Sequence, residues 1–510
     1  MLWESIAKSI VDHRISDNPA IVSDEGELTY GELLAGVRAL ARTLKEMGVG
    51  PGHVVLTNLD NIPAFLVAVL ASAQLGAAFA PIDVGATDPE VEGIVALTGS
   101  NLVIAGGDQP RLRDLFDNIV RVNPAGAVID VTAAGLAPAS VDATIGCLQF
   151  SSGTTGLPKG ILMGHDALFY RTQYYTRLLG LSAADRTLCA LPLSHPHGSE
   201  TLALPTLMAG GTLFLKSPKY AFPLYVLEEI AQHRITFFSS IPAFYDAAVK
   251  LSLIHPPNLA ALRLSACGSA PLARSTAKEF HARFGVRLQQ IYGLAELHAI
   301  CMNRLDGESI TDDSVGKPVE GIEWRISGDI QAGAAEELVG ELVVRSKAMF
   351  TGYLNNDQAT RAKLRDGWLH TGDVVSVDRD GLFHVLGRKE DFVKVNGLKV
   401  YAAEVEKAII GLDWIKECAV LGERDAAGAE RIVAHIVPAD SAGPSEDVQA
   451  LLIKELRSVI SEHKLPKRCV VWSALPKSPM GKILKSKIAG RSGVTNSKKG
   501  EPDHVVHQTL

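Results

Sequence analysis

The sequence lacks the features that several protein classes require. Its six cysteines are scattered and include no CxxC pair, so neither a zinc site nor a dithiol redox motif is indicated. Acidic residues outnumber basic residues by 57 to 50, which argues against a general nucleic-acid binder with a basic surface. No internal repeat or long low-complexity segment occurs. We therefore expect a cytoplasmic globular protein with reduced, buried thiols that binds no nucleic acid.

Signals for secretion and membrane insertion are also missing. The N-terminus, MLWESIAKSIVDHR, carries early charges and no apolar core, unlike a secretory signal. The stretch 62–82 is nearly long enough to span a bilayer, but it is rich in alanine and is interrupted by Gln74, Gly76 and Pro81. We expect this stretch to form a buried helix that leads into a core strand, with no membrane insertion.

The order of the expected elements predicts an α/β fold. The stretch 28–49 has helical apolar spacing and ends at Gly50-Pro51, and VVLTNL, a helix at 62–74 and AAFAPI follow. Such alternation predicts βαβ units and a large domain of mainly parallel sheets flanked by helices. Short strands with Gly and Asp turns at about 310–387 predict a small β-barrel-like unit. After Gly387 a helix–strand–strand–helix order predicts a small α+β module.

These patterns define the expected domains of the 510-residue chain. We expect a large N-terminal domain at 1–387, a hinge at 388–390 and a mobile small C-terminal domain at 391–490. The polar residues 491–510 are expected to form a disordered tail.

The stretch SSGTTGLPKG at 151–160 follows an expected strand and is suited to hold an anion. Its backbone N–H groups and hydroxyls can surround a phosphate, its glycines allow close approach, and its lysine adds a positive charge. The spacing differs from G-x-x-x-x-G-K-[ST], which argues against a P-loop ATPase or kinase. The expected phosphate contacts are Ser151, Ser152, Gly153, Thr154, Thr155, Gly156 and Lys159.

Further stretches occur in the order of a known family. They are CGSAPL at 267–272, IYGLAELH at 291–298, GELVVRSKAMFTGYLN at 340–355, DGWLHTGDV at 366–374, GRKEDFVKVNGLKVYAAEVE at 387–406 and PKSPMGKILK at 476–485. Together with the loop at 151–160, they resemble the adenylate-forming superfamily: acyl-CoA synthetases, adenylation domains of peptide synthetases and firefly luciferase. The resemblance covers residues 151–485, about two-thirds of the chain.

The resemblance implies a nucleotide site. Tyr292 would stack on adenine, and Asp373 would take the ribose hydroxyls through its two acceptor oxygens together with Arg388. Glu296 would hold Mg²⁺. Lys482 would be the catalytic lysine that brings a carboxylate and the α-phosphate together. The remaining implied contacts are the metal contact of Thr155 and the nucleotide contacts of Gly268, Ser269, Ala270 and Gly293.

The resemblance also implies a rotation of the small domain. This domain would turn about Glu390 after adenylation and present another face for thioester formation. Lys394, Asn396 and Gly397 would then line a tunnel for the thiol, because a glycine leaves room for a pantetheine arm.

Three positions depart from the family pattern. Ala295 stands where most relatives have a threonine that touches the α-phosphate, although some aryl-acid-activating members also have alanine there. Ala402 replaces a frequent proline, and Glu390 stands where aspartate or lysine is usual.

The stretch LPLSHPHGSE at 191–200 bears on the acid. It offers no carboxylate before Glu200, and an unpaired buried ammonium would be costly, so α-amino acids are disfavoured. By resemblance His195 would border the acyl pocket and assist catalysis, whereas His195 and His197 could instead pack in the core. The expected pocket floor is Ser239, Ser240, Ala243, Phe244, Gly268, Gly293 and Leu297, with Phe244 equally consistent with the core.

We therefore predict an acid–thiol ligase that is a monomer or homodimer. ATP would activate an aryl or short acyl acid to an acyl-adenylate, pyrophosphate would leave, and CoA would take the acyl group. The pantetheine of a separate carrier protein is an alternative acceptor, since no carrier-like domain follows Lys482. Two other classes remain open: a phosphotransferase that releases ADP, and a non-catalytic binding protein that retains the fold.

Overall fold

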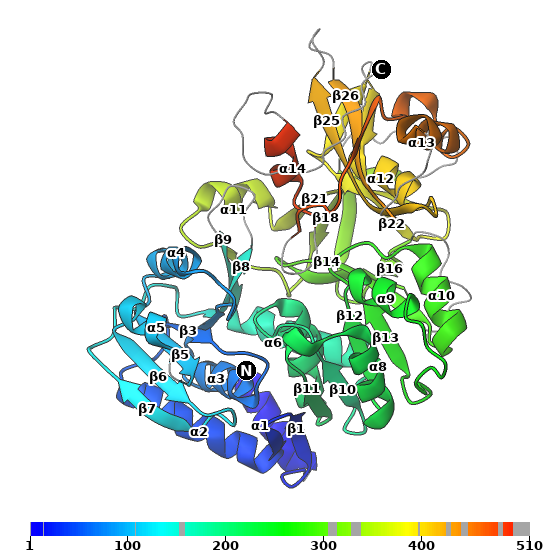
Figure 1. Ribbon diagram of the computed structural model, residues 1–510. Helices are drawn as coiled ribbons and strands as arrows, with labels where there is room; N and C mark the ends of the chain where they lie inside the picture. Colours follow the sequence, from blue (N-terminus) through cyan, green and yellow to red (C-terminus); the bar gives the residue numbers. More distant parts are fainter. Residues whose placement is uncertain are drawn as a thin grey trace.

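The computed structural model describes residues 2–13, 15–107, 109–151, 159–303, 314–327, 338–395, 398–424, 430–439, 447–477 and 483–492. Two lobes lie side by side in Figure 1, one coloured blue to cyan and one green. A third region, coloured yellow to red, lies above them and contains the C-terminal elements. The α/β class and the smaller C-terminal domain predicted from the sequence are both observed.

An eight-stranded sheet forms the core of the first lobe, in the order β19-β9-β8-β4-β3-β5-β6-β7. The pairs among β3, β4, β5, β6 and β8 are parallel, and β7, β9 and β19 add antiparallel edges. The strands are β3 (Val54–Asn58), β4 (Ala78–Pro81), β5 (Leu102–Gly106), β6 (Asn118–Val122), β7 (Val128–Thr132), β8 (Ile145–Ser151), β9 (Lys159–Gly164) and β19 (Gly352–Tyr353).

A nine-stranded sheet forms the second lobe, in the order β16-β15-β14-β13-β12-β10-β11-β1-β2. Its six central strands, from β14 to β1, are parallel. The strands are β1 (Pro19–Ser23), β2 (Gly26–Thr29), β10 (Arg186–Cys189), β11 (Thr212–Leu215), β12 (Phe237–Ser240), β13 (Leu264–Cys267), β14 (Leu288–Leu294), β15 (His298–Met302) and β16 (Lys317–Pro318).

The β-rich unit expected at about 310–387 is a five-stranded antiparallel sheet. Its strands are β17 (Glu323–Ser327), β18 (Leu338–Arg345), β20 (Leu364–Arg365), β21 (Trp368–Val377) and β22 (Phe383–Arg388). Two strands of the same span belong elsewhere, since β16 joins the nine-stranded sheet and β19 pairs with β9. The local sequence does not show which sheet β16 and β19 join, because strand pairing depends on contacts with segments distant in the sequence.

Two smaller sheets follow. The hairpin of β23 (Phe392–Val395) and β24 (Leu398–Tyr401) is antiparallel, and β25 (Ile415–Arg424), β26 (Glu430–Pro438) and β27 (Arg468–Val471) form a mixed sheet. Helix α14 (Lys485–Ser492) includes the first two residues of the predicted tail at 491–510, and the rest of that tail lies outside the described residues.

Capping interactions determine where the helix predicted at 28–49 begins. The expected helix at 28–49 starts later, because Thr29 and Glu32 form a reciprocal capping box and the residues before Tyr30 belong to β2. The helices of the large domain are α1 (Leu2–His13), α2 (Tyr30–Glu46), α3 (Pro63–Gln74), α4 (Asp88–Thr98), α5 (Pro110–Leu115), α6 (His165–Leu178), α7 (Leu204–Met208), α8 (Pro223–Gln232), α9 (Pro242–Val249), α10 (Arg274–Phe284) and α11 (Asp357–Lys363). The small domain adds α12 (Ala402–Ile410) and α13 (Val448–Leu456).

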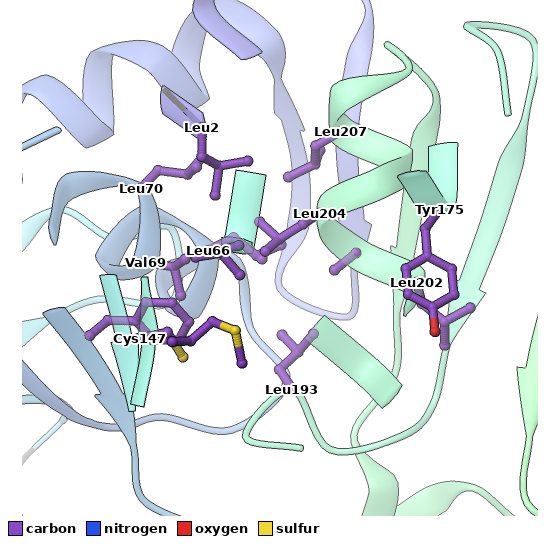
Figure 2. Packing of buried hydrophobic residues seen from close by; sticks show 14 of the residues in the cluster. Leu2, Leu66, Val69, Leu70, Cys147, Tyr175, Leu193, Leu202, Leu204 and Leu207 are labelled. Atoms are coloured by element: carbon purple, nitrogen blue, oxygen red, sulfur yellow. The ribbon is translucent and has the colours of Figure 1, made fainter. Parts of the chain in front are cut away.

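Helix α3 is the buried helix predicted from the alanine-rich stretch, and it leads into the fully buried strand β4. Figure 2 shows Leu66, Val69 and Leu70 of this helix beside Leu2 of α1 and Leu204 of α7. In the described part of the chain, no helix is long and apolar enough to cross a bilayer. The six cysteines are buried as free thiols, as expected.

Candidate active site

The predicted phosphate loop is held by two paired strands. Strand β8 ends at Ser151, β9 begins at Lys159, and these two residues are register partners in the antiparallel pair. The two ends of the loop are therefore side by side. Several predicted site residues lie outside the described part of the chain, and they are Ser152, Gly153, Thr154, Thr155, Gly156, Lys482, Asn396 and Gly397.

Glu296, the predicted metal contact, lies between β14 and β15 and is held by Tyr353. The Tyr353 hydroxyl donates a hydrogen bond to the Glu296 carboxylate, and the Glu296 carbonyl accepts one from the Phe350 N–H at 2.7 Å. The Lys159 ammonium lies 5.8 Å from the centre of the Tyr353 ring. Because β19 pairs with β9, Tyr353 links the start of β9 to the carboxylate. A cation and an anion suited to a metal–polyphosphate group thus share one neighbourhood.

Tyr292, Asp373 and Arg388 meet although they come from three different strands. The Tyr292 hydroxyl donates to Asp373 Oδ2 at 2.6 Å, and Arg388 Nε lies 2.9 Å from Asp373 Oδ1. Burial, followed by the charge of Asp373, raises the pKa of Tyr292, so the phenol stays protonated and donates. The two residues expected at the ribose and the one expected at adenine are therefore in direct contact.

Asp373 follows a tight turn that several side chains support. Gly372 has a φ of +74°, and its N–H lies 3.2 Å from Glu341 Oε1. Glu341 Oε2 also accepts from Lys389 Nζ at 2.7 Å, and the Lys389 N–H donates to the Gly372 carbonyl at 2.7 Å. The turn is thus held from β18 and from Lys389, the middle residue of the expected hinge.

His197 joins the expected acyl region to the expected adenine loop. Its Nε2 lies 2.7 Å from the Ser239 hydroxyl and its Nδ1 3.1 Å from the Ser269 hydroxyl. A Cβ built on Gly268 would lie 3.3 Å from His197 Cε1, so this glycine allows the ring to approach. Ser269 has a φ of +69°, a strained value for a residue with a side chain.

Both histidines of the 191–200 stretch are neutral at pH 7. Burial lowers the pKa of His195 to about 4, and burial together with the neighbouring His195 lowers the pKa of His197 to about 3. The His197 backbone N–H donates to His195 Nδ1 at 3.2 Å, which assigns the proton of neutral His195 to Nε2.

The other residues expected in the acyl pocket differ in their burial. Phe244 packs edge-on against Phe238 and Tyr245 inside the second hydrophobic cluster, and Ala243 is exposed on the same helix. Leu297 is buried in the first hydrophobic cluster. Exposed Gly293 is required by packing, since a Cβ there would lie 1.9 Å from the His298 carbonyl oxygen. Ala270, expected at the nucleotide and not in this pocket, is half-buried after Ser269.

A buried ion pair ties the site segments together. Arg171 Nη1 lies 3.0 Å from Glu200 Oε2, and the two side chains are 1% and 0% exposed. Gln149, two residues before the end of β8, also donates to Glu200. Arg171 donates further to the carbonyls of Ala348, at 2.8 Å, and Ala295, at 3.3 Å. Residues next to the phosphate loop, to Glu296 and to the segment of Tyr353 are therefore anchored to one buried ion pair.

The structure describes the residues of the expected hinge and one of the three residues expected in the thiol tunnel. Glu390 is exposed, and so is Lys394, whose backbone N–H donates to Glu430 at 2.9 Å. After the expected hinge, Asp391 accepts from Lys485 Nζ at 2.8 Å, and Glu406 lies 2.9 Å from the same ammonium. Helix α14 is thereby tied to the first residue after the hinge.

Sequence reasoning did not assign several of these residues. Tyr353 lies in the stretch GELVVRSKAMFTGYLN, which resembles a family motif, but only strand pairing places it against Glu296. Arg171 and Glu200 are 29 positions apart, and no local pattern signals that they pair. Lys363 ends a charged helix that is typical of a solvated surface, yet its ammonium reaches the turn before Asp373.

Comparison with known proteins identifies the family of this chain. The family model described as AMP-binding enzyme matches residues 10–354, and the model of its C-terminal domain matches residues 404–482. This chain belongs to the AMP-binding enzyme family. The adenylate-forming superfamily predicted from the motifs is thereby confirmed, and with it the class of AMP-forming acid–thiol ligases.

Named members of the AMP-binding enzyme family match nearly the whole chain. A feruloyl-CoA synthase of Amycolatopsis sp is 33% identical over 492 residues, covering 94% of this chain and 97% of the relative. An indoleacetate–CoA ligase of Aromatoleum aromaticum is 32% identical over 491 residues, covering 92% and 94%. The crystal structure of an anthranilate CoA ligase in complex with anthranoyl-AMP has a TM-score of 0.84 and 25% identity, covering 96% of both chains.

Proposed function

We propose that this enzyme activates an aryl or short acyl acid with ATP and transfers the acyl group to the thiol of CoA. A carboxylate oxygen attacks the α-phosphorus, the bond to the β-phosphate breaks, and pyrophosphate leaves. The thiolate sulfur then attacks the carbonyl carbon of the acyl-adenylate, and AMP leaves. The absence of an obvious nucleophile–base pair in the sequence is consistent with a route that needs no covalent enzyme intermediate.

The meeting of Tyr292, Asp373 and Arg388 carries this proposal. These residues are the adenine and ribose contacts expected from the motifs, and they touch one another across separations of 81 and 15 positions (373 − 292 and 388 − 373). Glu296 and Lys159 share contact with Tyr353. A nucleotide bound along these two clusters would have its base and ribose at the first and its phosphates at the second.

The residues present suit Mg²⁺. This ion prefers oxygen ligands and is usually bound through one or two carboxylates together with substrate phosphates. Glu296 offers one carboxylate, and no group of three or more His, Cys, Asp or Glu residues that could hold a metal occurs in the described part of the chain. Glu296 and Thr155 would hold the ion, which when bound would neutralise phosphate charge.

Charge in the acyl region supports an acid without an α-ammonium group. Glu200, the nearest carboxylate in the 191–200 stretch, is fully buried and is occupied by Arg171 and Gln149. His195 and His197 are neutral because burial lowers the pKa of each, so they offer an ammonium no counter-charge. The names of the relatives, which include feruloyl-CoA synthase and indoleacetate–CoA ligase, favour an aromatic acid.

CoA is the preferred acceptor because the relatives of nearly equal length are named as CoA ligases. In this proposal the small domain turns about Glu390, and Lys394, Asn396 and Gly397 line the thiol tunnel. A pantetheine arm on a separate carrier protein remains the alternative acceptor, since both need the same adenylation step. Turnover with free CoA, compared with turnover on a carrier protein, distinguishes the two.

The reaction is tested by acid-dependent exchange of labelled pyrophosphate into ATP, screened over aryl, short-chain and dicarboxylic acids. Lys482→Ala is expected to lower exchange at least about 100-fold, because one cation of the preorganised site is removed. Thioester formation from supplied acyl-adenylate should be affected much less, since that step no longer needs the α-phosphate to be attacked.

Two results would contradict the proposal. Wild-type exchange rates in Lys482→Ala would rule out the role assigned to Lys482 in adenylation. ADP in place of AMP among the products would indicate a phosphotransferase.

A further inference from the structure

Lys363 brings a further cation to the nucleotide clusters. It is the last residue of α11, and its ammonium donates to the Thr371 carbonyl at 2.8 Å. The same carbonyl accepts from Arg388 Nη1 at 3.0 Å. A Cβ built on Gly372 would lie 3.3 Å from Lys363 Nζ and 3.6 Å from Arg388 Nη1. The two cations therefore lie against the same turn, directly before Asp373.

The ammonium of Lys363 is only partly compensated. The side chain is half-buried. Burial and the nearby Arg388 lower its pKa, an effect that the carboxylates of Glu296, Asp373 and Glu341 oppose. Its bond to Thr371 uses one of three N–H donors, and among the described residues no carboxylate pairs with it directly. A desolvated ammonium whose described acceptor is a single neutral carbonyl is suited to an anionic ligand.

The position of Lys363 indicates which anionic group of the nucleotide it would contact. Helix α11 contacts both clusters: its Thr360 hydroxyl accepts from the N–H of Tyr353, the residue that holds Glu296, at 2.9 Å. Its last residue, Lys363, reaches the turn before Asp373, which is expected at the ribose. In ATP and in an acyl-adenylate, the group that follows the ribose on the way to the outer phosphates is the α-phosphate. We propose that Lys363 is a nucleotide-binding residue that donates to the α-phosphate. The proposal rests on the proposed function, which assigns the two clusters to a nucleotide.

A purely supporting role is the alternative. In that case Lys363 only holds the Thr371 carbonyl and keeps the turn before Asp373 in place. Such a role would affect the ribose contact as much as the phosphate contact, so nucleosides and nucleotides would lose affinity together.

Calorimetric binding of adenosine, AMP and ATP separates the two roles. Lys363→Met is expected to weaken AMP about 10- to 100-fold, the size of a lost charged hydrogen bond, and to leave adenosine unchanged. Lys363→Gln keeps an N–H donor for Thr371 without the charge, and it should weaken AMP equally. Lys363→Arg should retain most of the AMP affinity. Arg361→Met removes an exposed charge from the same helix and should change none of the three constants.

The outcomes are distinct. Wild-type AMP affinity in Lys363→Gln, or equal losses for adenosine and AMP in Lys363→Met, would overturn the role of Lys363 and leave the proposed function standing. Failure of the wild-type protein to bind AMP and ATP would overturn both.

Discussion

Single side chains in the site are oriented by partners from distant segments. Glu296 belongs to the turn between β14 and β15, but Tyr353 of β19 holds its carboxylate. The hydroxyl of Tyr353 limits the rotation of that carboxylate, and outer partners of this kind orient metal-binding groups. The proposed metal contact therefore depends on a residue of another sheet.

Removing the Tyr353 hydroxyl should lower the apparent affinity of the enzyme for Mg²⁺. Tyr353→Phe is expected to raise the Mg²⁺ concentration for half-maximal pyrophosphate exchange about tenfold, because the carboxylate loses its donor. The KM for the acid should stay unchanged. A magnesium titration of the exchange rate measures the effect.

Tyr220 offers a matched control, because it is 61% exposed. Tyr220→Phe removes a solvated hydroxyl and should leave the titration as in the wild type. An unchanged titration in Tyr353→Phe would show that Glu296 needs no such support.

Helices and strands around the site are joined by the buried pair of Arg171 and Glu200. Arg171 extends from α6, and Glu200 lies in a π-helical turn at His197–Ala203, a conformation often found at functional sites. Burial raises the pKa of Glu200, and Arg171 opposes this shift. Because both side chains are buried, water cannot solvate the remaining charge if one partner is removed.

Arg171→Met should therefore be strongly destabilising. We expect the free energy of unfolding to fall by about 3–5 kcal/mol, because a buried carboxylate loses its cationic partner. The double variant Arg171→Met with Glu200→Leu should recover part of the loss, since no buried charge remains. Urea unfolding followed by circular dichroism measures both changes.

The exposed pair of Arg361 and Asp357 gives the comparison, with side chains 82% and 88% exposed and 3.7 Å apart. Arg361→Met should change the unfolding free energy by less than about 1 kcal/mol. Equal effects of the Arg171 and Arg361 substitutions would show that the buried pair contributes no more than a surface contact.

The stability of the folded protein depends on pH through its buried histidines. Burial lowers the pKa of His195, His197 and His435, to about 4, 3 and 4 respectively. An unfolded histidine titrates near pH 6.5, so below that pH the unfolded chain binds protons that the folded chain does not. Stability should therefore be complete above about pH 6.5 and should decline as the pH falls towards 4.

His435 allows a test within the small domain. It is fully buried and accepts from Trp472 Nε1 at 3.0 Å, and its Nε2 has no partner among the described residues. His435→Leu should reduce the stability lost between pH 7 and pH 4 by on the order of 3 kcal/mol, since one proton-binding difference is removed. Thermal unfolding across that range measures the effect.

Exposed His255 serves as the reference for this experiment. His255→Leu should keep the wild-type dependence on pH. The same acid sensitivity in His435→Leu as in the wild type would contradict the role of burial.

Several features were accessible from the residue order. The alternation of apolar strands and helices predicted the parallel sheets, the alanine-rich apolar stretch predicted buried α3, and seven ordered motifs predicted the family. These signals are local, because strand and helix periodicities and loop glycines act over a few residues. The boundary at Tyr30 was missed, although Thr29 and Glu32 have the spacing of a capping box.

The composition and motifs of this chain were sufficient to establish its fold class and its superfamily. The pairing of Tyr353 with Glu296, of Arg171 with Glu200, and the approach of Lys363 to the turn before Asp373 required the folded arrangement. Periodicity specifies which side of an element is apolar, but it does not specify which distant element covers that side. Packing and strand pairing make that choice, and they bring the charges of the site together.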